Sequence, residues 1–143
     1  MAMAMDEPVA TPGGAGEGPA GLLLSRDLIF TSKIMGTAQA LGHRVTTAGN
    51  MALATTLIEQ GHPRVVFVDL GAGDLVSPAA LASYRKAAGP ATRFLAFGSH
   101  VDTQALAAAA AAGCDPVLPR SRFSAQLPDL IRLYLGKPET SVG

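Results

Sequence analysis

Short apolar runs alternate with longer amphipathic stretches along most of the chain. The runs have the length of buried strands, and the stretches repeat their apolar positions with the period of a helix. They predict strands at residues 22–24, 45–48, 65–68, 94–97 and 117–118, and helices at residues 29–41, 51–60, 78–88, 103–112 and 123–135. Five strand-then-helix units predict a parallel sheet with helices on both faces and right-handed crossovers.

Residues that commonly end or begin helices stand at the predicted boundaries. Glycine most easily adopts the left-handed conformation that ends a helix, whereas Ser and Asp cap the first turn. The predicted left-handed C-caps are Gly42, Gly61, Gly89 and Gly113, and the predicted N-caps are Ser77, before Pro78, and Asp102. These boundaries support a single three-layer α/β/α domain.

The length of 143 residues fits one domain with its own core. Residues 1–20 are rich in Pro, Gly, Ala and acids and lack apolar periodicity, so burial cannot repay the entropy of ordering them. We expect a disordered tail at residues 1–20, the folded domain at residues 21–136 and a second tail at residues 137–143.

Composition narrows the classes of function. Eleven basic and eleven acidic residues give zero net charge, and aromatic residues make up only 5%, which disfavours nucleic-acid binding. Cys114 is the single cysteine, so an internal disulfide and a cysteine-rich zinc site are excluded, and a cytoplasmic location is expected. The N-terminus lacks the pattern of a signal peptide, and no apolar run is long enough to span a bilayer.

Asp69 is the leading candidate for a functional residue. It directly follows the apolar run at residues 65–68 and so stands at the carboxyl end of a buried strand. Ligands bind at this edge in open parallel α/β sheets. The alternative is a structural role, in which Asp69 caps the loop that follows.

Ser99 and His100 follow the fourth predicted strand and should lie at the same edge. His100 could donate a hydrogen bond to an acid or a ligand and act as a pH switch, or simply face solvent in a loop. The chain has no Gly-x-Ser-x-Gly, His-x-x-His or Cys-x-x-Cys pattern, and no complete dinucleotide fingerprint. Esterase chemistry, a zinc site and a nucleotide cofactor are therefore not expected.

The order of elements and a few positions resemble the receiver domains of response regulators. An acid follows the first strand, Val68-Asp69-Leu70 closes the third, and Gly113-Cys114-Asp115 precedes the fifth. The resemblance covers residues 21–136 and implies a five-stranded parallel sheet of flavodoxin-like topology. It also implies a phosphoacceptor at Asp69.

The resemblance is incomplete around that position. Receivers have two adjacent acids after the first strand, and these fall on Arg26 and Asp27, so the first acid is replaced by a cation. The lysine after the fifth strand falls on Arg120, and the hydroxyl after the fourth falls on Gly98 or Ser99. Asp27 also has a structural alternative, because it can cap the first helix.

Phosphoryl transfer to a carboxylate requires Mg²⁺, which Asp27 and Asp69 would hold. Arg26 and Arg120 make the site formally neutral without a metal, so Mg²⁺ affinity should be weak, and either arginine can lock Asp69 in an ion pair. The resemblance therefore implies a degenerate, non-catalytic receiver that signals without phosphorylation.

Two alternatives remain for the same edge of the sheet. One is a phosphoacceptor modified on Asp69 with an altered Mg²⁺ site. The other is a small α/β ligand-binding protein or enzyme whose polar pocket contains Asp27, Asp69, Ser99, His100 and Arg120.

In receivers, the fourth helix, fifth strand and fifth helix form a common partner or dimer surface. The resemblance therefore predicts a protein partner or self-association through residues 103–135.

Overall fold

The computed structural model describes residues 20–136. Both predicted tails lie outside this range, apart from Ala20, which begins the first described strand. The strands are β2 (Ala20–Leu24), β3 (Arg44–Ala48), β4 (Val65–Asp69), β5 (Arg93–Gly98) and β6 (Val117–Pro119). The helices are α1 (Leu28–Ala40), α2 (Met51–Gly61), α3 (Pro78–Ala88), α4 (Thr103–Ala111), α5 (Arg120–Ala125) and α6 (Leu127–Leu135), with a short 3-10 helix, η3 (Gly73–Val76).

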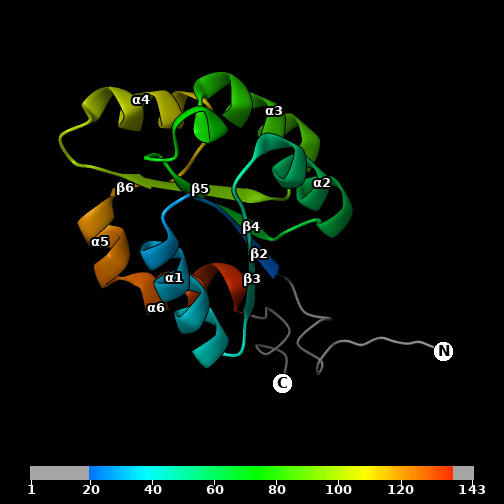
Figure 1. Ribbon diagram of the computed structural model, residues 1–143, viewed down its shortest axis with the longest axis vertical. Helices are drawn as coiled ribbons and strands as arrows, with labels where there is room; N and C mark the ends of the chain where they lie inside the picture. The colour runs from blue at the N-terminus through cyan, green and yellow to red at the C-terminus, as the bar shows by residue number, and fades with distance from the viewer. Residues whose placement is uncertain (1–19, 137–143) are drawn as a thin grey trace.

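All five strands pair in parallel, in the order β3-β2-β4-β5-β6. Helices α2, α3 and α4 cover one face of the sheet, and α1, α5 and α6 cover the other (Figure 1). The architecture is therefore the three-layer α/β/α arrangement of the flavodoxin-like fold, as the alternation of strands and helices predicted.

The core consists of two apolar layers separated by the sheet. Every residue of β4 is buried, which explains why this strand is a continuous apolar run rather than an alternating one. Phe67, Phe97 and Phe123 pack in the layer on the α1 side, and Tyr84 packs in the other layer. The small aliphatic residues of the sequence fill the remaining space.

The predicted helix caps are largely confirmed. Ser77 accepts a hydrogen bond from the N–H of Ala80 at 3.1 Å, and Asp102 accepts one from Ala105 at 3.1 Å. Gly42, Gly89 and Gly113 have positive φ. The prediction for Gly61 was wrong, since α2 continues through it and His62 adopts the left-handed conformation, with φ of 46°.

The last predicted helix, residues 123–135, is two helices in the structure. Helix α5 begins at Arg120, directly after β6, and ends at Ala125, and α6 begins at Leu127. Pro128 lies in the first turn of α6, where a proline lacks no hydrogen bond, whereas inside a continuous helix it would break one. The early start of α5 matters because it places Arg120 at the edge of the sheet where β4 ends.

The register of the strands brings several chain segments to that edge. Leu24 pairs with Val68, Asp69 pairs with Phe97, and Gly98 pairs with Pro119. Because parallel strands end together, the loops after β2, β4, β5 and β6 meet around Asp69. Across residues 20–136, the helices are all too short or too polar to cross a membrane.

Candidate functional site around Asp69

Asp69 ends the central strand with its carboxylate turned into a set of donors. The residue is 1% exposed. Its Oδ2 accepts a hydrogen bond from the hydroxyl of Ser25 at 2.8 Å, and its Oδ1 accepts one from the backbone N–H of Gly71 at 2.9 Å. Oδ1 also accepts a hydrogen bond from Nη2 of Arg120 at 3.0 Å. Both carboxylate oxygens of this buried acid therefore have protein partners.

Arg120 neutralises two acids from the first residue of α5. Nη2 lies 3.0 Å from Oδ1 of Asp69, and Nη1 lies 3.5 Å from Oδ2 of Asp27. The guanidinium carbon also lies over two aromatic rings, 4.6 Å from the centroid of Phe30 and 5.7 Å from that of Phe97. Ion pairing and cation–π attraction act in the same direction, so they hold the guanidinium in one position.

Asp27 caps α1, as the structural alternative suggested, and also forms an ion pair with Arg120. Its Oδ1 accepts a hydrogen bond from the N–H of Phe30 at 3.0 Å and so caps α1. Its Oδ2 faces Arg120. The cap fixes the start of α1 and with it the ring of Phe30, which packs under the guanidinium.

Arg26 does not contact Asp69 and instead connects three loops. Its Nε donates to the carbonyl of Gly49 at 3.0 Å, and its Nη1 donates to the carbonyl of Ala72 at 3.2 Å and to Oδ1 of Asp74 at 2.9 Å. Of the two arginines, Arg120 is the one that pairs with Asp69, and Arg26 pairs with Asp74. Arg26 fixes the loops after β2, β3 and β4 relative to one another.

Ser25 is the member of the site that the sequence reasoning missed. It directly follows β2, is 3% exposed and donates to Asp69, while its Oγ accepts from the N–H of Asp27 at 3.1 Å. The register of the two strands could have indicated this contact. Leu24 pairs with Val68, so the residues that follow them, Ser25 and Asp69, are neighbours. Ser25 and Arg26 are the two residues directly after β2, and Asp27 follows them as the N-cap of α1.

Ser99 and His100 lie at the same edge but do not join Asp69. Both are exposed, and the hydroxyl of Ser99 accepts from the N–H of Val101 at 3.3 Å. Gly98 ends β5 beside Leu70, and a Cβ at Gly98 would lie 3.0 Å from the Cβ of Leu70. The side chain of Leu70 therefore fills the space that a larger residue at position 98 would need.

The residues at this edge do not fit a magnesium ion. Asp69 already accepts three hydrogen bonds, Asp27 caps a helix and faces Arg120, and Asp74 pairs with Arg26. Mg²⁺ requires near-octahedral oxygen ligands, whereas Arg120 already pairs with the carboxylate oxygens of Asp69 and Asp27. Within residues 20–136, no three His, Cys, Asp or Glu side chains gather as a metal site.

No family model matches the chain, and no curated protein matches it. Several solved structures do. A CheY-like receiver domain from Methanospirillum hungatei aligns with a TM-score of 0.71 and 15% identity, over 87% of this chain and 98% of that one. A sensor-kinase receiver domain from Pseudomonas aeruginosa, with magnesium in its active-site cleft, aligns with a TM-score of 0.68 and 17% identity, over 84% and 99%.

A third match comes from a complex of two proteins. It is the co-crystal structure of two Saccharomyces cerevisiae proteins, the receiver domain of the response regulator Ssk1 and the histidine phosphotransfer signaling protein Ypd1. The alignment has a TM-score of 0.69 and 15% identity, and it covers 82% of this chain and 89% of that one. This chain therefore has the fold of response-regulator receiver domains.

Proposed function

We propose that this chain is a non-catalytic, receiver-like signalling module that binds a protein partner without phosphorylation of Asp69. The observation that carries the proposal is the arrangement of Ser25, Gly71 and Arg120 around the carboxylate of Asp69. A phosphoacceptor must present a free carboxylate oxygen to the phosphoryl donor, and its Mg²⁺ must neutralise the oxygens of the transferred group.

The charges at the edge support the same conclusion. In the Pseudomonas receiver domain a magnesium ion is coordinated in the cleft. Here Arg120 pairs with Asp69 and Asp27, and Arg26 pairs with Asp74. The chain thus carries its own cations at the edge, and a divalent ion would meet two positive groups.

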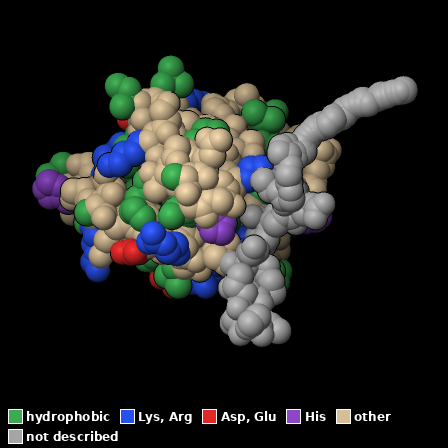
Figure 2. All heavy atoms as spheres, turned by 90° about the horizontal axis from the view of Figure 1, so that it is seen from below, with side chains coloured by type: hydrophobic (Ala, Val, Ile, Leu, Met, Phe, Trp, Pro, Cys, Tyr) green, Lys and Arg blue, Asp and Glu red, His purple; other side chains and the backbone are tan. Residues whose placement is uncertain are grey.

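The partner surface that we propose spans residues 103–135. Helix α4 has one buried residue, Ala109, and exposes Ala107, Ala110 and Ala111, so another helix could approach its backbone closely. Leu133 of α6 is 70% exposed. On the face of α1, α5 and α6, basic side chains are spread among scattered hydrophobic ones (Figure 2). The Ssk1–Ypd1 complex is a precedent for a receiver domain binding another protein.

The first test is an amide-resolved NMR titration of the full chain with Mg²⁺ and then with beryllofluoride, a phosphoryl mimic. We expect no saturable shifts at Ser25, Asp69 or Gly71 at millimolar Mg²⁺, because their polar atoms are already paired. Saturable shifts clustered at these three residues would overturn the proposal.

A gain-of-function variant tests whether the arginines are the reason that Mg²⁺ does not bind. Ser25→Asp combined with Arg26→Asp and Arg120→Lys restores two acids after β2 and a point cation after β6. This variant should bind Mg²⁺ and respond to beryllofluoride. The matched control is Arg122→Lys, which makes the same exchange at an exposed position of α5. If the triple variant folds and still binds no Mg²⁺, the arginines do not explain the lack of Mg²⁺ binding.

A phosphoacceptor role for Asp69 is the second candidate. The observation in its favour is that the residue lies at the end of the central strand with a cation 3.0 Å from Oδ1. Incubation with a small-molecule phosphodonor and Mg²⁺, followed by intact-mass measurement, tests it. A phosphoryl adduct that Asp69→Asn abolishes would establish this role in place of the first.

A further inference from the structure

A cavity separates part of α3 from α4, which lie side by side on one face of the sheet (Figure 1). This α3–α4 cavity has a volume of about 180 Å³, and its lining residues come from residues 70–81 and 105–109. One of them is Leu70, which directly follows Asp69 and packs in the core layer on the α3 side. The cavity therefore lies at the same edge of the sheet as the candidate site.

The α3–α4 cavity exists because α4 presents only methyl groups to it. The lining residues from α4 are Ala105, Ala108 and Ala109. Their short side chains leave space in front of Leu81 of α3, which lines the opposite wall. Protein interiors contain few voids larger than a water molecule, so a space of this size is an unfilled position between the two helices.

The lining of the α3–α4 cavity is apolar and uncharged. Its apolar residues outside α4 are Leu70, Val76, Pro78 and Leu81. Arg26 lies beside one lining residue, since a Cβ at Gly73 would be 3.8 Å from its Nη1, but its charge is matched by Asp74 at 2.9 Å. An ion that entered an apolar cavity would lose its water without gaining a partner. The lining therefore favours an uncharged ligand.

Ser77 supplies a polar group to the α3–α4 cavity. Its Oγ accepts a hydrogen bond from the N–H of Ala80 at 3.1 Å and so caps α3. Within residues 20–136, the hydrogen of this hydroxyl has no acceptor. A hydroxyl can donate while it accepts, so Ser77 can donate to an oxygen of a ligand whose carbon atoms fill the rest of the cavity.

We propose that the α3–α4 cavity binds a small uncharged ring compound that carries one oxygen, of which phenol is the simplest example. An apolar cavity of about 150 Å³ holds benzene, so about 180 Å³ is enough for one ring with a hydroxyl group. Pockets for drug-sized ligands usually span about 300–1,000 Å³, which favours a single ring here. The ring would lie between Leu70 and the alanines of α4. This inference goes beyond the proposed function and does not depend on it.

An NMR titration of the full, isotope-labelled chain with phenol is the first test. The amides that we expect to shift saturably are those of Leu70, Ser77, Ala105 and Ala108. We expect a dissociation constant of about 1 mM or lower, which is well within the affinity that a ligand of this size can reach. The absence of saturable shifts at these amides would overturn the proposal.

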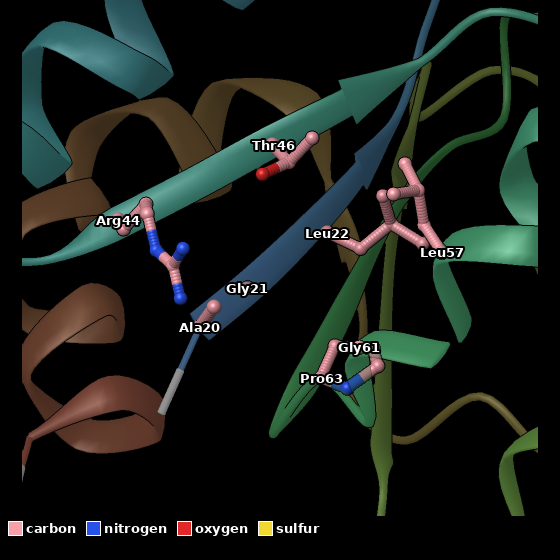
Figure 3. A pocket seen from close by; sticks show the side chains of 8 residues that line it. All are labelled: Ala20, Gly21, Leu22, Arg44, Thr46, Leu57, Gly61 and Pro63. Carbon is pink, nitrogen blue, oxygen red and sulfur yellow. The ribbon is translucent and has the colours of Figure 1, made fainter. Parts of the chain in front are cut away.

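A second hollow, at the opposite end of the sheet, makes the titration specific. It has a volume of about 150 Å³, and Leu22, Thr46 and Leu57 are among the residues that line it between β2, β3 and α2 (Figure 3). Shifts that cluster at Thr46 and Leu57 instead of at the α3–α4 cavity would overturn the proposal.

Variants that fill the cavity test its location. Ala108→Leu places a larger side chain in the α3–α4 cavity and should weaken phenol binding about tenfold or more. The matched control is Ala107→Leu, the same exchange at an exposed neighbour, which should leave binding unchanged. Ala105→Leu fills the cavity one turn earlier and replaces Ala108→Leu if circular dichroism shows that the latter does not fold. Unchanged phenol binding in a folded filling variant would overturn the proposal.

Changes of ligand and of Ser77 test the chemistry of the α3–α4 cavity. Benzoate has the same ring with a charge and should bind about tenfold more weakly than phenol or worse. Ser77→Gly removes the hydroxyl but keeps a residue that is accepted at a helix N-cap. It should weaken phenol binding about threefold or more and leave the affinity for toluene, which has no oxygen, unchanged. Benzoate binding as tight as that of phenol, or phenol binding that Ser77→Gly leaves unchanged, would overturn the proposed ligand chemistry.

Discussion

Arg120→Ala should destabilise the fold more than the loss of an exposed charge would. The substitution removes the cation beside Asp69, which is 1% exposed, and leaves a buried carboxylate with only the Ser25 hydroxyl and the Gly71 N–H as partners. It also removes a guanidinium that packs on the ring of Phe30. A buried negative charge without a nearby cation is costly even when two neutral donors remain.

The size of the effect follows from the burial of the two partners. Breaking a fully buried ion pair by removing one member costs about 3–5 kcal/mol. The Arg120 side chain is 36% exposed, so solvent screens part of the interaction and the lower end applies. The lost cation–π contact adds about 0.5–1 kcal/mol. We expect a loss of stability of about 3.5 kcal/mol for Arg120→Ala.

Asp69→Asn should cost less than Arg120→Ala. It leaves Arg120 with Asp27 and with solvent, so no buried charge is left alone. We expect a loss of stability of about 1.5 kcal/mol for this variant, at the lower end of the net value of one hydrogen bond to a charged group. The double variant should cost clearly less than the sum of the two, because a neutral amide at position 69 no longer requires a cation.

Urea unfolding at pH 7, followed by circular dichroism, measures these differences. Arg122→Ala is the matched control, since it removes an exposed arginine of the same helix and should change stability by less than about 0.5 kcal/mol. If Arg120→Ala lowers the free energy of unfolding by no more than Arg122→Ala does, the argument that Asp69 requires a cation beside it is wrong. A larger loss for Asp69→Asn than for Arg120→Ala would refute it equally.

Three further variants or measurements probe neighbouring features. Ser25→Ala removes the hydroxyl donor of Asp69 and should cost about 1–3 kcal/mol in urea unfolding, whereas a neutral result would show that water replaces the hydroxyl. Gly98→Ser places a Cβ 3.0 Å from Leu70 and should cost about 1–3 kcal/mol, a loss that Leu70→Ala should partly recover. Burial raises the pKa of Cys114 to about 11, against a smaller opposing effect of Arg85. Its reaction with a thiol reagent at pH 8 should therefore be much slower than in urea, and the stability that the neutral thiol contributes should be lost as pH rises from about 9 to 11.

Sequence pattern predicted the fold well because parallel strands are buried on both faces. Val65–Val68 is apolar throughout for this reason, and the helices that follow such runs must return the chain to the same end of the sheet. The boundary at residue 126 was missed because apolar spacing continues through Phe123, Leu127 and Leu130. The break is set by backbone geometry at Pro128 and by packing against the sheet.

The candidate site was predictable only in part. Asp69 and Arg120 stand at strand ends, so their sequence positions suggested that they lie at one edge. The choice between Arg26 and Arg120 depended on contacts with Gly49, Ala72 and Asp74, which are far from Arg26 in sequence. Ser25 was not predicted because a serine after a strand has many ordinary roles. Only the pairing of Leu24 with Val68 shows that Ser25 lies beside Asp69.

The positions of the two arginines bear on how such a module could be regulated. A switch that depends on phosphorylation needs loops that can adopt two arrangements of similar free energy. Arg26 ties the loops after β2, β3 and β4 together, and Arg120 is held by two acids and two rings. Both sets of contacts favour a single arrangement of this edge without any added ligand. If the proposed function is correct, control lies in the availability of the partner rather than in chemistry at Asp69.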